Sequence, residues 1–262
     1  GVAVDAEAQE EREEELAKML KKDPLDVRPV DTGLQPHEEL WVRTHGGRSA
    51  KDVRWIDDDT LLFSSWVPDG RGNYQPDLFT WAPESGKERR LTRQANLREA
   101  EPCGDFAIAV HRIHGGSGLV RVSLEDGSTT PLTDPAPGIV EGNPRMDSAC
   151  QTVAWLRNDG EWRVIVASPD DLKGTEQELT LPPGGQPLSL DVRPDGKSVV
   201  VALGTEGWFD LWERPLPEGD WVRRTAGVGG VFDPDASTDG SVFYLAQTAQ
   251  GFDLHHLPAD AP

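Results

Sequence analysis

RPDGKSVVVALGTEGWFDLWERPLPEGDWVRRT, residues 193–225, contains the repeating pattern that decides the fold. An Asp-Gly turn at 195–196 precedes an apolar segment at 198–204 that is rich in valine, as expected of a buried strand. After a polar turn, a second apolar segment at 210–216 leads to a short stretch that ends in Thr225. This spacing predicts short antiparallel strands joined by tight turns.

The same order of elements recurs along the chain, and a threonine at the end of each unit marks the period. Successive threonines are 41 to 48 residues apart, at Thr44, Thr92, Thr133, Thr180 and Thr225. A period of about 40–45 residues with four short strands is typical of a propeller blade. The sequence therefore predicts an all-β fold, a β-propeller of about five four-stranded blades over residues 37–262.

The repeat resembles that of the TolB-like, or PD40-type, propellers over about residues 38–260. The matching motifs are the turns RPDG (193–196) and STDG (237–240), the Asp-Leu pairs at 77–78, 210–211 and 253–254, and RRLT at 89–92. Residues 103–105 and 146–151 lack the Asp-Gly turn, so we expect altered turns there. The Gly-His and Trp-Asp signature of WD40 repeats is absent, and Gly-Gly pairs do not recur at one place as in kelch repeats.

The last unit of the repeat region lacks a fourth strand, and the first unit consists of a fourth strand alone. The last unit stops after a third strand at 252–257, and the first recognisable strand, 39–44, has no blade before it. Because an unpaired strand edge is a liability, we predict that residues 39–44 pair with residues 252–257 and close a five-bladed ring. The alternative is a truncated piece of a propeller with six or more blades, which the absence of Met at position 1 favours.

Residues 1–36 differ from the rest of the chain. Residues 5–22 are rich in glutamate, contain neither Gly nor Pro, and end in lysines, which predicts a helix whose charges suit its dipole. Pro24, Pro29 and Pro36 then indicate an extended linker. The sequence predicts an acidic helical arm, either solvated or the tail of an upstream domain; a docking helix for a partner is the alternative.

Composition excludes several functions. The net charge of −20 argues against binding to nucleic acid or to anionic lipid, and no apolar run is long enough for membrane insertion. Two cysteines exclude a disulfide scaffold. Cys103 and Cys150 fall in the first-strand regions of neighbouring units, so a disulfide between them is open, but isolated buried thiols are commoner.

The chain has no motif of a common enzyme class. Gly-x-Ser-x-Gly, His-Glu-x-x-His, the P-loop and the dinucleotide fingerprint are all absent, and we expect neither cofactor nor metal. Residues 233–240, DPDASTDG, resemble the start of a calcium loop but coincide with the turn of the repeat, and Tyr244 stands where such a loop has Glu. His255 and His256 are adjacent in a predicted strand, so they face opposite sides and cannot share a metal.

Alignment of the units selects a candidate ligand site. The residues just before the Pro-like position of each first strand are Asp52, Glu101, Asn143, Ser189 and Asp233. The first strand of a blade lines the central channel, so these residues predict a polar, mainly acidic ring at the channel mouth. Such a ring favours a cation, a basic side chain or a peptide amino terminus; the alternative is a water-filled channel with no ligand. Trp66 and Trp208, beside polar loops, are candidate exposed anchors for a partner.

The resemblance implies a non-catalytic platform that binds a protein or peptide, as part of an envelope-associated complex or as the accessory domain of a peptidase. It further implies a periplasmic or extracellular location and, in the peptidase case, a covalently linked upstream domain. The competing hypothesis is a hydrolase that uses paired carboxylates at the channel mouth. A third is a truncated fragment without independent activity.

Overall fold

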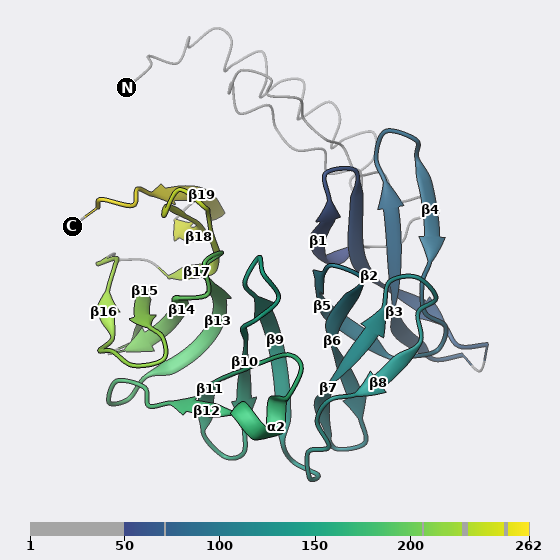
Figure 1. Ribbon diagram of the computed structural model, residues 1–262, viewed down its shortest axis with the longest axis horizontal. Coiled ribbons are helices and arrows are strands. Elements are labelled where there is room, and N and C mark those ends of the chain that lie inside the picture. Colours follow the sequence, from purple (N-terminus) through teal and green to yellow (C-terminus); the bar gives the residue numbers. More distant parts are fainter. Residues whose placement is uncertain (1–49, 71, 206, 227–229, 249–250, 262) are drawn as a thin grey trace, which may run out of the picture. The chain divides into compact units, whose positions relative to one another are not determined.

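The computed structural model describes residues 50–261 except 71, 206, 227–229 and 249–250. These residues form antiparallel meanders, and one short helix, α2 (Leu172–Thr175), is found among them (Figure 1). The strands are β1 (Lys51–Asp57), β2 (Thr60–Pro68), β3 (Tyr74–Ala82) and β4 (Lys87–Arg90); β5 (Leu97–Cys103), β6 (Phe106–Ile113), β7 (Gly116–Ser123) and β8 (Thr129–Pro131); β9 (Val140–Met146), β10 (Val153–Asn158), β11 (Trp162–Ala167) and β12 (Gln177–Leu179); β13 (Gln186–Val192), β14 (Ser198–Thr205), β15 (Trp208–Pro215) and β16 (Val222–Arg223); and β17 (Val231–Ala236), β18 (Val242–Thr248) and β19 (Gly251–Leu257).

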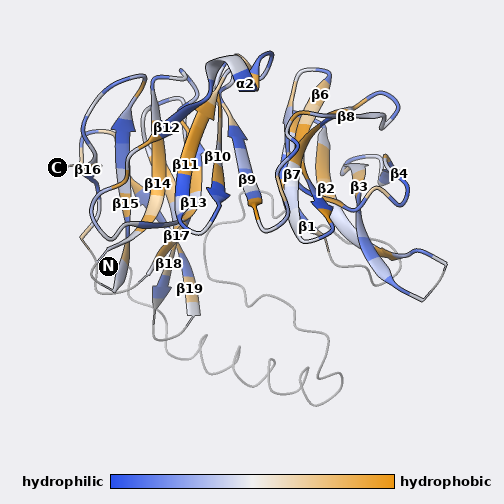
Figure 2. Ribbon diagram, turned by 90° about the horizontal axis from the view of Figure 1, so that it is seen from below, coloured by the Kyte–Doolittle hydropathy of each residue, from blue (hydrophilic) through white to orange (hydrophobic). Residues whose placement is uncertain are grey.

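Each meander is one blade, so the described residues contain four four-stranded blades and a fifth with three strands. The predicted propeller fold is confirmed. Blades pack against one another through apolar clusters formed by residues of consecutive blades, as in the cluster of Leu156, Val164, Leu190 and Val201 from blades 3 and 4. The middle strands carry most of this apolar surface, and β11 and β14 are largely orange in Figure 2.

In blades 1 and 4 the recurring threonine holds the outer strand to the third strand. Thr92 Oγ1 accepts the N–H of Leu78 at 2.9 Å and donates to Asp77 Oδ1 at 3.1 Å. Asp77 is fully buried and also pairs with Arg90. Thr225, Asp210 and Arg223 repeat the arrangement in blade 4. The Asp-Leu and Arg-x-Thr motifs therefore form one buried polar contact. The Thr hydroxyl and the Arg guanidinium donate the hydrogen bonds that the buried carboxylate needs.

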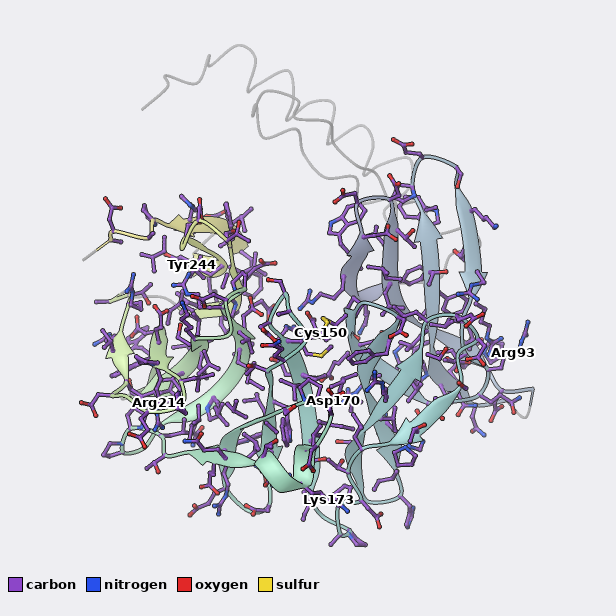
Figure 3. All side chains as sticks on the ribbon, viewed as in Figure 1. Arg93, Cys150, Asp170, Lys173, Arg214 and Tyr244 are labelled. Atoms are coloured by element: carbon purple, nitrogen blue, oxygen red, sulfur yellow. A yellow bond between two sulfur atoms is a disulfide. The ribbon has the colours of Figure 1, made fainter. Side chains whose placement is uncertain are left out.

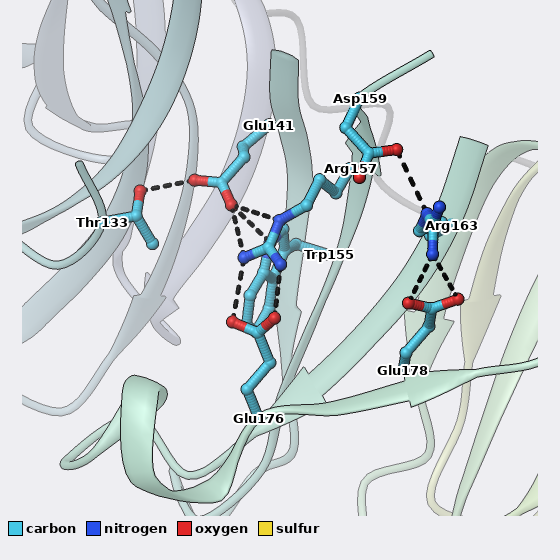
Figure 4. A network of polar contacts seen from close by, with 8 residues as sticks. All are labelled: Thr133, Glu141, Trp155, Arg157, Asp159, Arg163, Glu176 and Glu178. Carbon is cyan, nitrogen blue, oxygen red and sulfur yellow. Dashed lines mark hydrogen bonds and ion pairs between the residues drawn. The ribbon is translucent and has the colours of Figure 1, made fainter. Parts of the chain in front are cut away.

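Blade 2 makes the same contact with a carboxylate from the next blade. Gly118 stands where blades 1, 4 and 5 have Asp, and Thr133 Oγ1 donates instead to Glu141 of β9. Glu141 is 1% exposed and also accepts from Trp155 Nε1 at 3.2 Å and Arg157 Nε at 2.8 Å. Figure 4 shows the Arg157 guanidinium between Glu141 and Glu176. This buried network joins blades 2 and 3.

A disulfide also joins these two blades. Cys103, at the end of β5, is bonded to Cys150, in the turn after β9, with their Cα atoms 5.8 Å apart (Figure 3). The interpretation of both residues as isolated buried thiols was therefore wrong. The physical reason is the period of the repeat: a separation of 47 residues places the two cysteines at the same end of adjacent inner strands.

The altered turns that we expected are present. Cys103 pairs with Phe106 across a two-residue turn in which Gly104 has φ +60°. In blade 3, Asp147 Oδ1 accepts the N–H groups of Gln151 and Thr152 and so replaces the Asp-Gly turn. The calcium-loop alternative is excluded because Val231–Ala236 is the inner strand β17.

The predicted closing strand, 39–44, and the predicted helical arm, 1–36, lie outside the described residues. Within the described part, β19 pairs with β18, and its Phe252 and Leu254 are 62% and 71% exposed. Ring closure therefore stays a prediction.

Candidate functional site in the central channel

The inner strands share an irregularity that sets the geometry of the channel. In each, the register with the second strand shifts near the strand start, for example between Lys51 and Arg54 and between Arg98 and Glu101. Four residues at this bulge have left-handed backbones: Asp52, Glu99, Asn143 and Asp233, with φ between 47° and 53°. In β13 the shift lies between Pro187 and Ser189, so Ser189 directly follows the bulge and is paired with Ala202. We call Asp52, Glu99, Asn143, Ser189 and Asp233 the bulge residues.

Four of the five sequence-predicted site residues are bulge residues, and Glu101 is not. The shift between Arg98 and Glu101 makes Glu99 the equivalent of Asp52, and Glu101 the equivalent of Arg54. The sequence alignment used the residue before proline as its guide. Pro102 lies two positions further along its strand than Pro144 and Pro234 do, so this guide selected Glu101, which lines the channel at the Arg54-equivalent position, and not Glu99 at the bulge.

The side chains of the bulge residues connect each inner strand to the next. Asp52 Oδ2 accepts the N–H of Glu99 at 3.2 Å, and Glu99 Oε2 accepts the N–H of Asn143 at 2.7 Å. Asn143 Oδ1 accepts the N–H of Leu190 at 2.9 Å, and Ser189 Oγ accepts the N–H of Asp233 at 2.9 Å. These bonds hold the five inner strands in the same register. Most side chains of the predicted acidic ring therefore bind the backbone of the next blade.

Two adjoining cavities form the channel. The first, of about 290 Å³, is lined by Asp52, Glu99, Asn143 and Asp233, whereas Ser189 is 3% exposed and lines neither cavity. The second, of about 380 Å³, is lined by inner-strand residues of all five blades. We call its ionisable residues at the Arg54-equivalent position the channel residues: Arg54, Glu101, Arg145, Asp191 and Asp235. Arg54, Arg145 and Asp235 line both cavities.

The channel residues carry mixed charge, which the sequence alignment did not anticipate. Glu101 Oε2 lies 3.0 Å from Arg54 Nε and 3.7 Å from Arg145 Nη1. Burial raises the pKa of Glu101, and the two neighbouring guanidinium groups oppose that rise. One side of the channel, from blades 1 to 3, is therefore an Arg–Glu–Arg cluster in which both guanidinium groups face one carboxylate.

The other side of the channel, from blades 4 and 5, carries carboxylates. Burial raises the pKa of Asp191 to about 7, opposed by the hydrogen bond that its Oδ2 accepts from the N–H of Ala236 at 2.7 Å. Asp235 is exposed, and its carboxylate makes no hydrogen bond or ion pair within the described residues. A cationic group fits best here, because an unpaired carboxylate is available to it.

Exposed aromatic side chains gather at one end of the blades. In every blade the hairpin between the second and third strands lies beside the start of the inner strand, as the pairs Leu97 with His111 and Val140 with Asn158 show. Because the inner strands are in phase, these hairpins share one face, which we call the hairpin face. Its exposed aromatic residues are Trp66 (37%), Tyr74 (64%), Trp162 (40%), Trp208 (52%) and Phe252 (62%). The predicted exposure of Trp66 and Trp208 is confirmed.

No metal site is evident among residues 50–261 as far as they are described, since no group of three His, Cys, Asp or Glu side chains comes together. His255 packs on Tyr244 and His256 on Phe243, on opposite faces of the sheet as predicted. Within the same residues, no helix is long and apolar enough to cross a membrane.

No family model and no curated protein matches the chain. Solved structures do. The putative TolB from Agrobacterium tumefaciens superposes with a TM-score of 0.65 at 16% identity, over 80% of this chain and 76% of that one. The chain has a TolB-like β-propeller fold.

The TolB-like propeller also matches parts of larger proteins. A puromycin-hydrolysing peptidase from Mycobacterium tuberculosis aligns with a TM-score of 0.61 at 16% identity, over 82% of this chain and 36% of that one. A chain of the nidogen/laminin complex aligns with a TM-score of 0.58 at 12% identity, over 76% and 72%. At these identities the likeness establishes the fold of the TolB-like propeller.

Proposed function

We propose that this propeller is a non-catalytic platform that binds a protein or peptide on its hairpin face. A basic group of the partner enters the channel through the first cavity, which lies nearer the start of the inner strands, and reaches Asp235. The observation that carries the proposal is the unpaired carboxylate of Asp235, in a channel whose arginines already face Glu101. The exposed aromatic residues of the hairpin face supply the apolar contact area that protein interfaces use. The similar fold in a nidogen/laminin complex supports a protein partner.

The Cys103–Cys150 disulfide supports a periplasmic or extracellular location, because such bonds persist in oxidising compartments. The likeness to about a third of a peptidase chain supports a role as an accessory domain covalently linked to a catalytic one. In that setting the platform positions a substrate for a neighbouring active site.

Peptide capture tests the platform. An immobilised library of hexapeptides with free amino termini is incubated with the full chain. The peptides that retain the protein are then labelled, and their affinities are measured by fluorescence anisotropy. We expect Arg, Lys or amino-terminal recognition, with Asp235→Asn weakening binding about tenfold, the effect of losing one charge-assisted hydrogen bond. Asp58→Asn removes the same charge from the exposed turn between β1 and β2, at the other end of the blade, and serves as the control. Equal losses in both variants, or no retained peptide, would contradict the proposal.

One observation favours a hydrolase as the second candidate. Asp191, with a pKa of about 7, shares a cavity with Glu101 and Asp235, and general acid catalysis by carboxylates needs one group that is still protonated near neutral pH. Against it, Asp191 Oδ2 is occupied by the N–H of Ala236. Hydrolysis of a panel of chromogenic glycosides tests this candidate. Hydrolysis by the full chain that Asp191→Asn abolishes would replace the platform proposal. Absence of hydrolysis of every glycoside would remove the hydrolase candidate.

A further inference from the structure

A third cavity lies on the hairpin face between blades 2 and 3. It has a volume of about 430 Å³ and shares no lining residue with the channel cavities. Its walls are formed by Arg98, Arg112, Gly115, Gly116 and Val140, from the start of β5, the β6–β7 hairpin and the start of β9. Two arginines thus line one cavity in a protein of net charge −20.

Arg112 is unusual among the arginines of the described residues. Apart from Arg93 and Arg112, each of those arginines has its guanidinium in an ion pair or a hydrogen bond to a backbone oxygen. Arg112 is bound within the described part of the chain through its backbone alone, to Asn96. Arg98 lies 3.2 Å from Glu99 Oε1, yet its buried Nε has no aligned hydrogen-bond acceptor. The cavity therefore holds one unpaired guanidinium and one incompletely satisfied one.

The hairpin beside these arginines contains two consecutive glycines, Gly115 and Gly116. A Cβ on Gly116 would lie 2.2 Å from the carbonyl oxygen of Ile139, so a side chain cannot be placed there without moving the backbone. Gly115, at φ +80°, sits in the conformation that favours glycine. Val140, 37% exposed, adds an apolar wall. Two consecutive glycines thus let the hairpin pack closely against residues 137–139 at the wall of the cavity.

We propose that this cavity is a subsite for a carboxylate of an acidic peptide segment, held by Arg112 and Arg98. A guanidinium is planar and donates two parallel hydrogen bonds to a carboxylate. The strongly negative protein repels acidic ligands elsewhere, so this cavity fixes where an Asp or Glu side chain of a partner can be accepted. A peptide is favoured over other anions because the cavity opens on the hairpin face, among exposed Trp and Phe side chains. The inference rests on the proposed platform but uses residues outside the channel.

The test is binding of a fluorescein-labelled peptide that carries three glutamates among Ala and Leu, measured by anisotropy with the full chain. Its matched control peptide has glutamine at the three positions. We expect the Glu peptide to bind, the Gln peptide to bind about tenfold more weakly or worse, and Arg112→Gln to lower affinity for the Glu peptide by about the same factor. Arg93→Gln removes an equal charge from an arginine that does not line this cavity and whose guanidinium has no ion pair or hydrogen bond within the described residues, and should change affinity less than twofold.

Equal affinity for the two peptides, or equal losses of affinity in the Arg112 and Arg93 variants, would overturn the subsite. Polygalacturonate serves as a carboxylate polymer that is not a peptide. Binding of this polymer that depends on Arg112, without binding of the Glu peptide, would overturn the peptide assignment. Asp235→Asn separates this inference from the platform proposal. Glu-peptide binding that survives Asp235→Asn but not Arg112→Gln supports the subsite even where no basic peptide enters the channel.

Discussion

Removal of the Cys103–Cys150 bond should lower the stability of the propeller substantially. The two cysteines are 47 residues apart, and closing a loop of that length costs the unfolded chain entropy worth about 4 kcal/mol at 25 °C. Measured effects of native disulfides are about 2–5 kcal/mol. Both cysteines also pack against the apolar cluster that contains the fully buried Trp155, so loosening this contact changes the surroundings of a fluorescent residue.

The assay is urea unfolding followed by tryptophan fluorescence, for the full chain and for the double variant Cys103→Ala/Cys150→Ala. We expect the midpoint of the variant to fall by about 1 M urea or more. The wild type in dithiothreitol should unfold with the midpoint of the variant, and the variant itself should not respond to dithiothreitol. A second variant, Cys103→Ser/Cys150→Ser, separates the loss of the bond from the change in side-chain polarity. Two titratable thiols in the native protein, or a midpoint unchanged by reduction, would refute the reasoning.

Two further predictions concern buried charge. Glu141→Ala leaves Arg157 and the Trp155 N–H without their buried acceptor and should lower the free energy of unfolding by about 3–5 kcal/mol. Glu178→Ala breaks the exposed pair with Arg163 in Figure 4 and should lower it far less, because water screens an exposed pair. Similar losses in urea unfolding would contradict the assignment. Asp191 has a folded pKa of about 7, above its ordinary value near 4, so its contribution to stability is greatest below pH 4 and is lost as the pH rises to 7. Asp191→Asn, which keeps an acceptor for Ala236, should therefore flatten the fall in urea midpoint between pH 4 and 7; an unchanged pH profile would show that Asp191 ionises normally.

The repeat period and the strand pattern predicted the fold well because both reflect burial. In the segment 198–204, for example, every buried residue is apolar, and the strand β14 begins at the first residue of that segment. The Asp-Leu and Arg-x-Thr motifs were visible in the sequence, but their contact was not, since nothing in the spacing shows that Thr92 bonds to Asp77. The sequence left the Cys103–Cys150 bond open and favoured free thiols, because a thiol and a half-disulfide are the same residue in a sequence.

The channel was less predictable than the fold. Alternation along a strand assigns side chains to faces only if no residue is inserted, and the bulge inserts one at the start of each inner strand. In β5 both Glu99 and Glu101 are candidates for the bulge position, and the sequence does not show which of them occupies it. Arg54 and Arg145, which give the channel its mixed charge, had no sequence signal of their own. The left-handed backbone at Asp52, Asn143 and Asp233 is favoured by Asn and Asp, and this could have marked the bulge.

The contact between neighbouring inner strands makes few demands on residue type. Aspartate, glutamate, asparagine and serine each fill the position, because it requires only an oxygen that reaches one backbone N–H. Since the donor belongs to the main chain, substitution at one unit needs no compensating substitution at its neighbour. Such a junction lets the sequence of one blade change without a matching change in the next, while the inner strands stay in phase.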